Sequence, residues 1–150
     1  MILYLDTSSL VKLYVDEPGS AEVQRLVEEA EIVATSVVAY PEARAALARR
    51  RRESSLTPAS HRRARAALEA DWPRFLSLDV AEPLAKSAGD LAGHQRLRGF
   101  DALHLASYLT FAREFASEDV RFSSADEALV RAARRTARRT ARPRRRRRRQ

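Results

Sequence analysis

The fold is decided by the N-terminal stretch ILYLDTSSLV, residues 2–11. Its four apolar residues, 2–5, have the character of a short buried strand, and this run stops abruptly at Asp6 and the hydroxyl residues after it. A helix is expected directly afterwards, from Ser8 to Val15. A buried strand that ends in an acid and hydroxyl groups indicates a polar site at the edge of a sheet.

The same alternation of strand and helix continues along the chain. Further strands are expected at residues 32–35, 75–80 and 120–122. Helices are expected at 20–29, from near Tyr40 to 52, at 58–71, 83–96 and 100–115, and from Ala125 onward. Strands that alternate with helices predict an α/β fold, with a mostly parallel central sheet covered on both faces in a three-layer α/β/α arrangement.

Length and charge set the domain organisation. A chain of 150 residues with 45% hydrophobic content can form one compact domain, and a second full domain does not fit. The net charge of +8 is very uneven, because the last 20 residues hold twelve arginines and no acid, while residues 1–130 have a net charge of −4. We therefore expect a globular domain at 1–135 and an Arg-rich tail at 136–150, disordered unless it binds an anionic partner.

Composition also excludes several classes of site and location. The chain has no cysteine, so a metal would be held by oxygen ligands or by the three scattered histidines, and oxygen is favoured. No segment is apolar for the length of a membrane span, and the start lacks the basic flank of a signal peptide. The expected location is the cytoplasm, without a membrane partner.

Four acids occupy comparable positions in the predicted elements. Asp6 follows the first strand, Glu42 and Asp101 lie in the first turns of helices, and Asp126 starts the last helix. Each of the three helix-associated acids has a structural alternative, since a carboxylate is favourable at a helix N-terminus, and Asp6 could also have a purely structural role. Strand ends and helix starts nevertheless converge on the carboxyl edge of a parallel sheet. We therefore expect these side chains to lie close together.

Clustered carboxylates have chemical consequences. They repel one another and have raised pKa values unless a cation neutralises them, and Mg²⁺ or Mn²⁺ suits such oxygen ligands. An ion of this kind can activate a water molecule and stabilise the charge that develops on a phosphate. The acids therefore predict metal-dependent hydrolysis of phosphodiester bonds.

Four segments resemble the motifs of a known family. The opening segment, residues 5–14, is similar to that of PIN-domain nucleases, especially the VapC-type toxins of bacterial toxin–antitoxin modules. Thr35 and Ser36 followed by Glu42 resemble the second motif, residues 100–106 the third and residues 122–126 the fourth. Each motif is weak alone, but the four occur in order, and together they cover the chain from residue 2 to about 135.

The resemblance implies an activity and partners. It implies that Asp6, Glu42, Asp101 and Asp126 bind Mg²⁺ or Mn²⁺ in an endoribonuclease that prefers single-stranded RNA. It also implies a homodimer that is inhibited by a cognate VapB-like antitoxin. The sequence departs from the family at Pro41, directly before Glu42, and after Arg134, where arginines replace a last edge strand. The sheet is therefore expected to have four or five strands.

Several residues have two interpretations. His104 could contact a substrate or a metal, or could simply pack in its helix. Ser8 and Ser124 could orient the acids or act as turn hydroxyls, and Asp119 is a weaker rival to Asp126 as the fourth acid. The run of arginines at 49–52 could contact RNA or an antitoxin, or could be a solvated helix end.

Two other functions compete with the nuclease. One is a non-catalytic RNA-binding protein that uses its basic tail, with purely structural acids. The other is a phosphatase or phosphotransferase with Asp6 as nucleophile, which is disfavoured because that chemistry wants a second acid two residues later, where this chain has Ser8.

Overall fold

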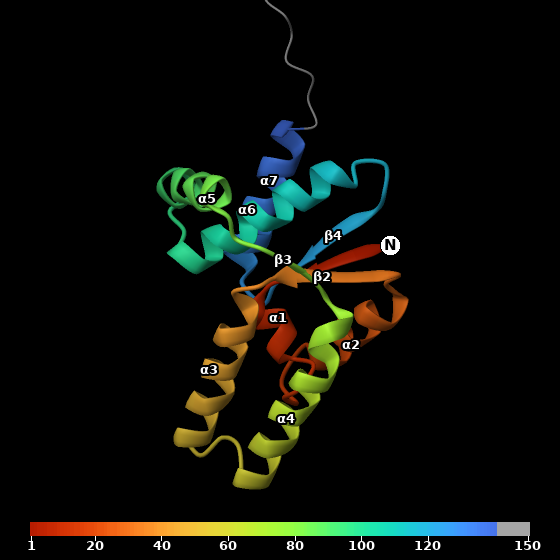
Figure 1. Cartoon of the computed structure of the whole chain (residues 1–150), viewed down its shortest axis with the longest axis vertical. Helices are drawn as coiled ribbons and strands as arrows, with labels where there is room; N and C mark the ends of the chain where they lie inside the picture. The colour runs from red at the N-terminus through yellow and green to blue at the C-terminus, as the bar shows by residue number, and fades with distance from the viewer. Residues whose placement is uncertain (141–150) are drawn as a thin grey trace, which may run out of the picture.

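The computed structural model describes residues 1–140, and its centre is a four-stranded sheet (Figure 1). The strands are β1 (Ile2–Leu5), β2 (Ile32–Ser36), β3 (Leu76–Leu78) and β4 (Val120–Ser123). Every pairing is parallel and the order is β3-β2-β1-β4, so β1 lies between β2 and β4. The expected parallel α/β sheet is confirmed with four strands, and residues 1–140 contain no fifth.

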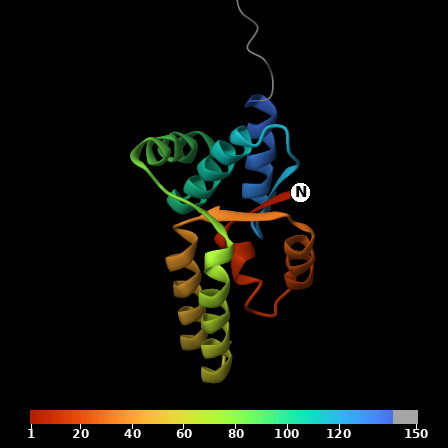
Figure 2. The ribbon, with the colours of Figure 1, turned by 45° about the vertical axis from the view of Figure 1, so that its right-hand side comes forward.

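Helices cover both faces of this sheet. They are α1 (Thr7–Val11), α2 (Ser20–Glu29), α3 (Ala39–Arg52), α4 (Pro58–Asp71), α5 (Glu82–Gln95), α6 (Gly99–Glu114) and α7 (Glu127–Thr140), with a short 3₁₀ turn, η1 (Trp72–Arg74). Figure 2 shows α1 to α4 on one side of the strands and α5 to α7 on the other. None of the helices in the described part combines the length and apolar character that a membrane crossing requires.

The alternation of side chains along β1 builds the two halves of the core. Leu3 and Leu5 pack with buried residues of α1 to α4. Ile2 and Tyr4 point to the other face and pack with residues of α6 and α7. Helix α5 lies outside this second layer and packs against α6 through small residues such as Ala88. The protein therefore has the expected three-layer architecture.

Two helix starts follow directly from local sequence. Thr57 caps α4, since its hydroxyl accepts a hydrogen bond from the Ser60 amide at 3.1 Å, and Pro58 occupies the first helical position. Pro41 lies in the first turn of α3, where a backbone N–H would have no partner within the helix. The helix begins at Ala39, close to the expected Tyr40, and Glu42 is placed one turn in.

Two elements are several residues shorter than the sequence prediction. Helix α1 ends at Val11 rather than Val15, because the chain turns there and Ser20 donates a hydrogen bond to the Val15 carbonyl at 2.8 Å. Strand β3 is limited to the three residues that pair with β2.

Helix α7 passes the boundary expected at residue 135. It continues to Thr140, because Leu129, Ala133 and Ala137 recur at four-residue spacing and pack on the core. The remaining part of the expected tail, residues 141–150, lies outside the described residues.

Candidate active site

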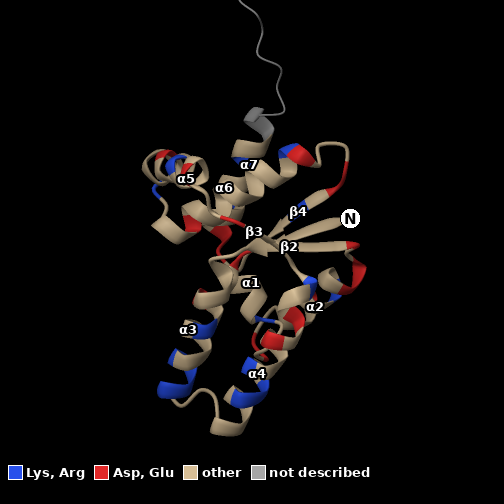
Figure 3. Ribbon diagram, in the orientation of Figure 1, with Lys and Arg blue, Asp and Glu red and all other residues tan. Residues whose placement is uncertain are grey.

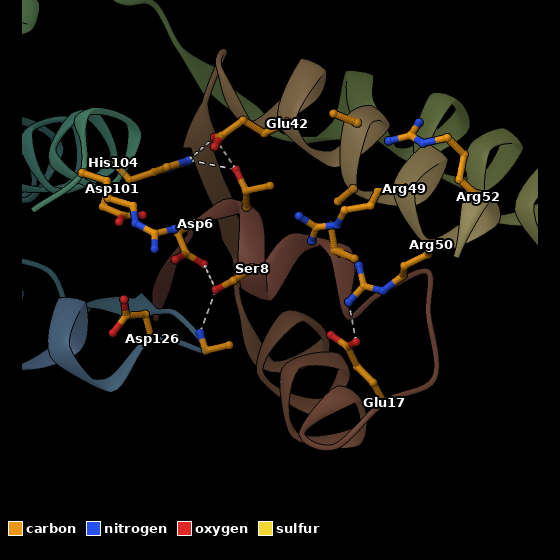
Figure 4. Close-up of a pocket in the computed structure, with 16 residues that line it drawn as sticks. Asp6, Ser8, Glu17, Glu42, Arg49, Arg50, Arg52, Asp101, His104 and Asp126 are labelled. Atoms are coloured by element: carbon orange, nitrogen blue, oxygen red, sulfur yellow. Dashed lines mark hydrogen bonds and ion pairs between the residues drawn. The ribbon is translucent and has the colours of Figure 1, made fainter. Parts of the chain in front are cut away.

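A pocket of about 720 Å³ lies at the carboxyl edge of the sheet, next to the ends of β1 and β4. All four acids that the sequence singled out line it: Asp6, Glu42, Asp101 and Asp126 (Figure 4). They come from four separate segments, namely the end of β1, helix α3, helix α6 and the start of α7. The structure therefore brings the expected acids together. Asp119 does not line this pocket and pairs with Arg121 at 2.9 Å, before β4 begins.

Asp6 is held by hydrogen bonds on both carboxylate oxygens. Its Oδ1 accepts from the Ser9 amide at 2.9 Å and from the Ser8 hydroxyl at 2.7 Å. Its Oδ2 accepts from the Ser124 hydroxyl at 2.5 Å, across the β1–β4 pairing. The side chain is 4% exposed and caps α1. Ser8 and Ser124 thus orient an acid, which is the first of their two expected roles.

Glu42 belongs to a network that begins in the core. Its Oε1 accepts from the Thr7 hydroxyl at 2.6 Å and lies 3.0 Å from His104 Nε2. His104 Nδ1 lies 3.2 Å from the hydroxyl of Tyr4, and Nε2 lies 2.9 Å from the Thr7 oxygen. In the uncharged ring these contacts are satisfied when Nε2 carries the proton and Nδ1 accepts from Tyr4, and in the charged ring both nitrogens donate. His104 therefore packs in its helix, as one interpretation had it, and also holds a site acid.

The pKa of Glu42 reflects this network. Burial raises it, but the hydrogen bonds from His104 and Thr7, with the charge of His104, outweigh burial, so the pKa lies below its ordinary value. Glu42 is accordingly kept as a carboxylate. His104 also lines the pocket, but it is only 2% exposed and both of its ring nitrogens have partners within the protein.

Asp101 and Asp126 complete the acidic half of the pocket. Burial raises the pKa of Asp101, and the charges of Asp126 and Asp6 raise it further, while Arg98 opposes them. Asp126 also caps α7, because its Oδ1 accepts from the amides of Ala128 at 2.7 Å and Leu129 at 3.2 Å. The capping role considered for Asp126 is therefore present, and only Oδ1 of its carboxylate accepts the capping hydrogen bonds.

The donor chemistry of the four acids fits a hard divalent ion. Within residues 1–140, no three His, Cys, Asp or Glu side chains are close enough to enclose a metal by themselves. Mg²⁺ needs no such cage, because it keeps several waters and takes one or two carboxylates. Burial is the main cause of the raised pKa of Asp101, and the neighbouring carboxylates add to it, so a cation bound in the pocket would favour the ionised form. Asp6, Glu42, Asp101 and Asp126 could therefore hold Mg²⁺ or Mn²⁺, directly or through water.

The other half of the pocket is basic. Arg49, Arg50 and Arg52 line it from the last turn of α3, and Figure 3 shows basic residues gathered at the ends of α3 and α4 away from the sheet. Arg98, directly before α6, also lines the pocket. Sequence reasoning did not single out Arg98, although its position three residues before Asp101 was a usable signal.

Comparison with known proteins places this site in a family. The model of the PIN domain family matches residues 3–128. Ribonuclease VapC45 and Ribonuclease VapC49, from the Mycobacterium tuberculosis strains CDC 1551 / Oshkosh and ATCC 25618 / H37Rv respectively, are each 37% identical over 108 residues. These alignments cover 72% of this chain and 75% of each relative.

Solved structures share the fold. FitAcB from Neisseria gonorrhoeae superposes with a TM-score of 0.60 at 19% identity, covering 89% of this chain and 94% of that one. VapBC2 from Rickettsia felis, bound to a DNA fragment from their promoter, gives 0.54 at 13% identity, covering 83% and 100%. The family model spans most of the chain, and together with the two relatives it confirms the expected family. The chain belongs to the PIN-domain family and, within it, to the VapC type.

Proposed function

We propose that the protein is an endoribonuclease that hydrolyses RNA phosphodiester bonds with Mg²⁺ or Mn²⁺. The observation that carries the proposal is the convergence of four acids from four separate segments on one pocket at the carboxyl edge of the sheet. The names of the VapC relatives support ribonuclease activity. The pocket's arginines support an anionic substrate, since a guanidinium matches the geometry of a phosphate.

The biological role proposed is that of the toxin in a type II toxin–antitoxin system. Relatives called VapC, and the likeness to the fold found in VapBC2, support this role. The protein would act as a homodimer in the cytoplasm and be inhibited by a cognate VapB-like antitoxin.

The chain's own residues would prepare the site for hydrolysis. Asp6, Glu42, Asp101 and Asp126 would hold the metal, directly or through water. When bound, the ion supplies a water of lowered pKa and neutralises charge on the phosphate.

Two sets of hydrogen bonds would keep the ligands in place. Ser8 and Ser124 fix the carboxylate of Asp6, and the pair of Thr7 and His104 fixes that of Glu42.

The test is an RNA cleavage assay with matched acidic variants. Purified full-length protein is incubated with single-stranded RNA in Mg²⁺ and in EDTA, alongside Asp6→Asn and Asp101→Asn. Asp119→Asn is the control, because it removes an acid that lies outside the pocket. We expect Mg²⁺-dependent cleavage by the wild type and by the control only. Cleavage that persists in EDTA, or in both pocket variants, would contradict the proposal.

The same assay addresses the competing RNA-binding function. A protein lacking residues 141–150 keeps all of the described helix α7 and loses seven of the twelve arginines in residues 131–150. A nuclease should still cleave RNA without these residues. If the wild type only binds RNA, and binding disappears with the deletion, the non-catalytic function is correct.

A further inference from the structure

One face of α3 runs from the acids to a group of arginines within a single pocket. Glu42, Ala45, Ala46 and Arg49 line the pocket in succession, followed by Arg50 and Arg52. Glu42 and Arg49 are seven residues apart, which is two helical turns and about 10 Å along the axis. The two alanines between them have no bulk to close the pocket. A chain lying along this face would therefore reach both the acids and the arginines (Figure 4).

The three arginines differ in what holds them. Arg50 is bound by Glu17 at 2.5 Å, and Glu17 also accepts from Lys12 at 3.2 Å, so Arg50 ties the loop before α2 to α3. Among the residues that the structure describes, no acid pairs with Arg49 or Arg52, and both side chains are exposed. Two uncompensated guanidinium groups therefore face one end of the pocket.

We propose that Arg49 and Arg52 form a subsite for one backbone phosphate of single-stranded RNA, next to the phosphate that is cleaved. The inference rests on the proposed function, because it takes the acids as the place of hydrolysis. The arginines are three residues apart on α3 and lie on one face, so both can reach the same phosphate. Their distance from Glu42 places that phosphate beyond the reacting one. Its role is to bind and align the strand, not to take part in bond cleavage.

The test measures how salt affects RNA binding. Fluorescence anisotropy follows a short labelled single-stranded RNA of mixed sequence binding to the full-length protein in EDTA, over a series of NaCl concentrations. The test variant is Arg49→Gln/Arg52→Gln. The matched control is Arg62→Gln/Arg65→Gln, which removes the same charge from exposed positions on α4 that do not line the pocket.

Loss of one phosphate contact should reduce the slope of log K against log[salt] by about 0.7 for a single strand. We expect that reduction in the test variant and a wild-type slope in the control. In the cleavage assay the test variant should raise KM and leave kcat nearly unchanged, because the contact is the same in the ground state and the transition state. Equal slopes for the two double variants would overturn the proposal.

Two further results separate this inference from its rivals. Suppose that the wild type itself fails to cleave RNA while the test variant still has a reduced slope of log K against log[salt]. In that case the proposed hydrolysis is wrong and the phosphate subsite stands. Poly-glutamate serves as the second probe in the same titration. If the test variant weakens binding to poly-glutamate and leaves RNA binding unchanged, the arginines take an acidic protein segment, and the RNA subsite is wrong.

Discussion

Replacing His104 by leucine should destabilise the protein in a way that depends on pH. The substitution places an apolar side chain at a position that is 2% exposed, and it removes both ring nitrogens. Glu42 then loses the donor at 3.0 Å, and the hydroxyl of fully buried Tyr4 loses the acceptor at 3.2 Å. A buried polar group without its partner costs about 1–3 kcal/mol. Because the Glu42 side chain is 27% exposed and water compensates in part, we expect a total loss of about 2–4 kcal/mol at pH 7.

The pH dependence follows from the pKa of Glu42. In the wild type this pKa is depressed below its ordinary value of 4.5. The ionised Glu42 therefore adds stability that is fully present above pH 4.5 and is lost as the pH falls through the lower folded-state pKa. Without His104, burial has less opposition and the pKa of Glu42 rises. The difference between His104→Leu and the wild type should thus be largest at neutral pH and shrink in acid.

Urea unfolding followed by circular dichroism gives the free energies at neutral and acidic pH. A second substitution, Tyr4→Phe, closes a double-mutant cycle, because it removes the hydroxyl that lost its partner. Tyr4→Phe should cost about 1 kcal/mol less in the His104→Leu background than in the wild type. Additive losses, or a loss for His104→Leu that is the same at both pH values, would refute the reasoning.

Three more measurements test the site and the core. Burial and then the neighbouring acids raise the pKa of Asp101, so the metal-free protein should lose stability as the pH rises through this pKa. Asp101→Asn should therefore raise Tm in EDTA at neutral pH. An unchanged or lower Tm would argue against the raised pKa. Mg²⁺ at a hundredfold excess over Kd should stabilise the wild type by about 2.7 kcal/mol in thermal melts and leave Asp6→Asn nearly unaffected; an equal shift in both would exclude Asp6 as a ligand. Leu105→Ala, at a fully buried position between α6 and the sheet, should cost about 2–5 kcal/mol in urea unfolding, and a cost below 1 kcal/mol would mean that this part of the core is loosely packed.

Much of the fold could be predicted because its signals are local. The bounds of β1, α2 and α4 agree with the sequence prediction, since an apolar run, a turn before Ser20 and a Thr57–Pro58 cap each act within a few residues. The end of α7 could not be predicted in the same way. Its arginines suggested a solvated tail, whereas the small residues Ala133 and Ala137 between them pack on the core in the folded protein.

The site likewise has some features that could be predicted from the sequence and others that depend on how the helices pack. That Asp6 and Asp101 share a pocket could be predicted, because the carboxyl edge of a parallel sheet collects strand ends and helix starts. The bond between His104 and Glu42 could not, because it joins residues 62 positions apart and depends on how α3 and α6 lie across the sheet. For the arginines at 49–52 the sequence left open a contact with RNA or an antitoxin and a solvated helix end, and Arg49 lines the pocket because α3 runs along it.

The central place of β1 in the sheet has a consequence during synthesis. Asp6 leaves the ribosome well before its partner Ser124, which follows 118 residues later, and β4 pairs directly with β1. Contacts between such distant residues form only once the later segment is available. A nascent chain therefore already contains Asp6, Glu42 and Asp101 before it can assemble the pocket. Translation itself delays the moment at which the proposed nuclease could act.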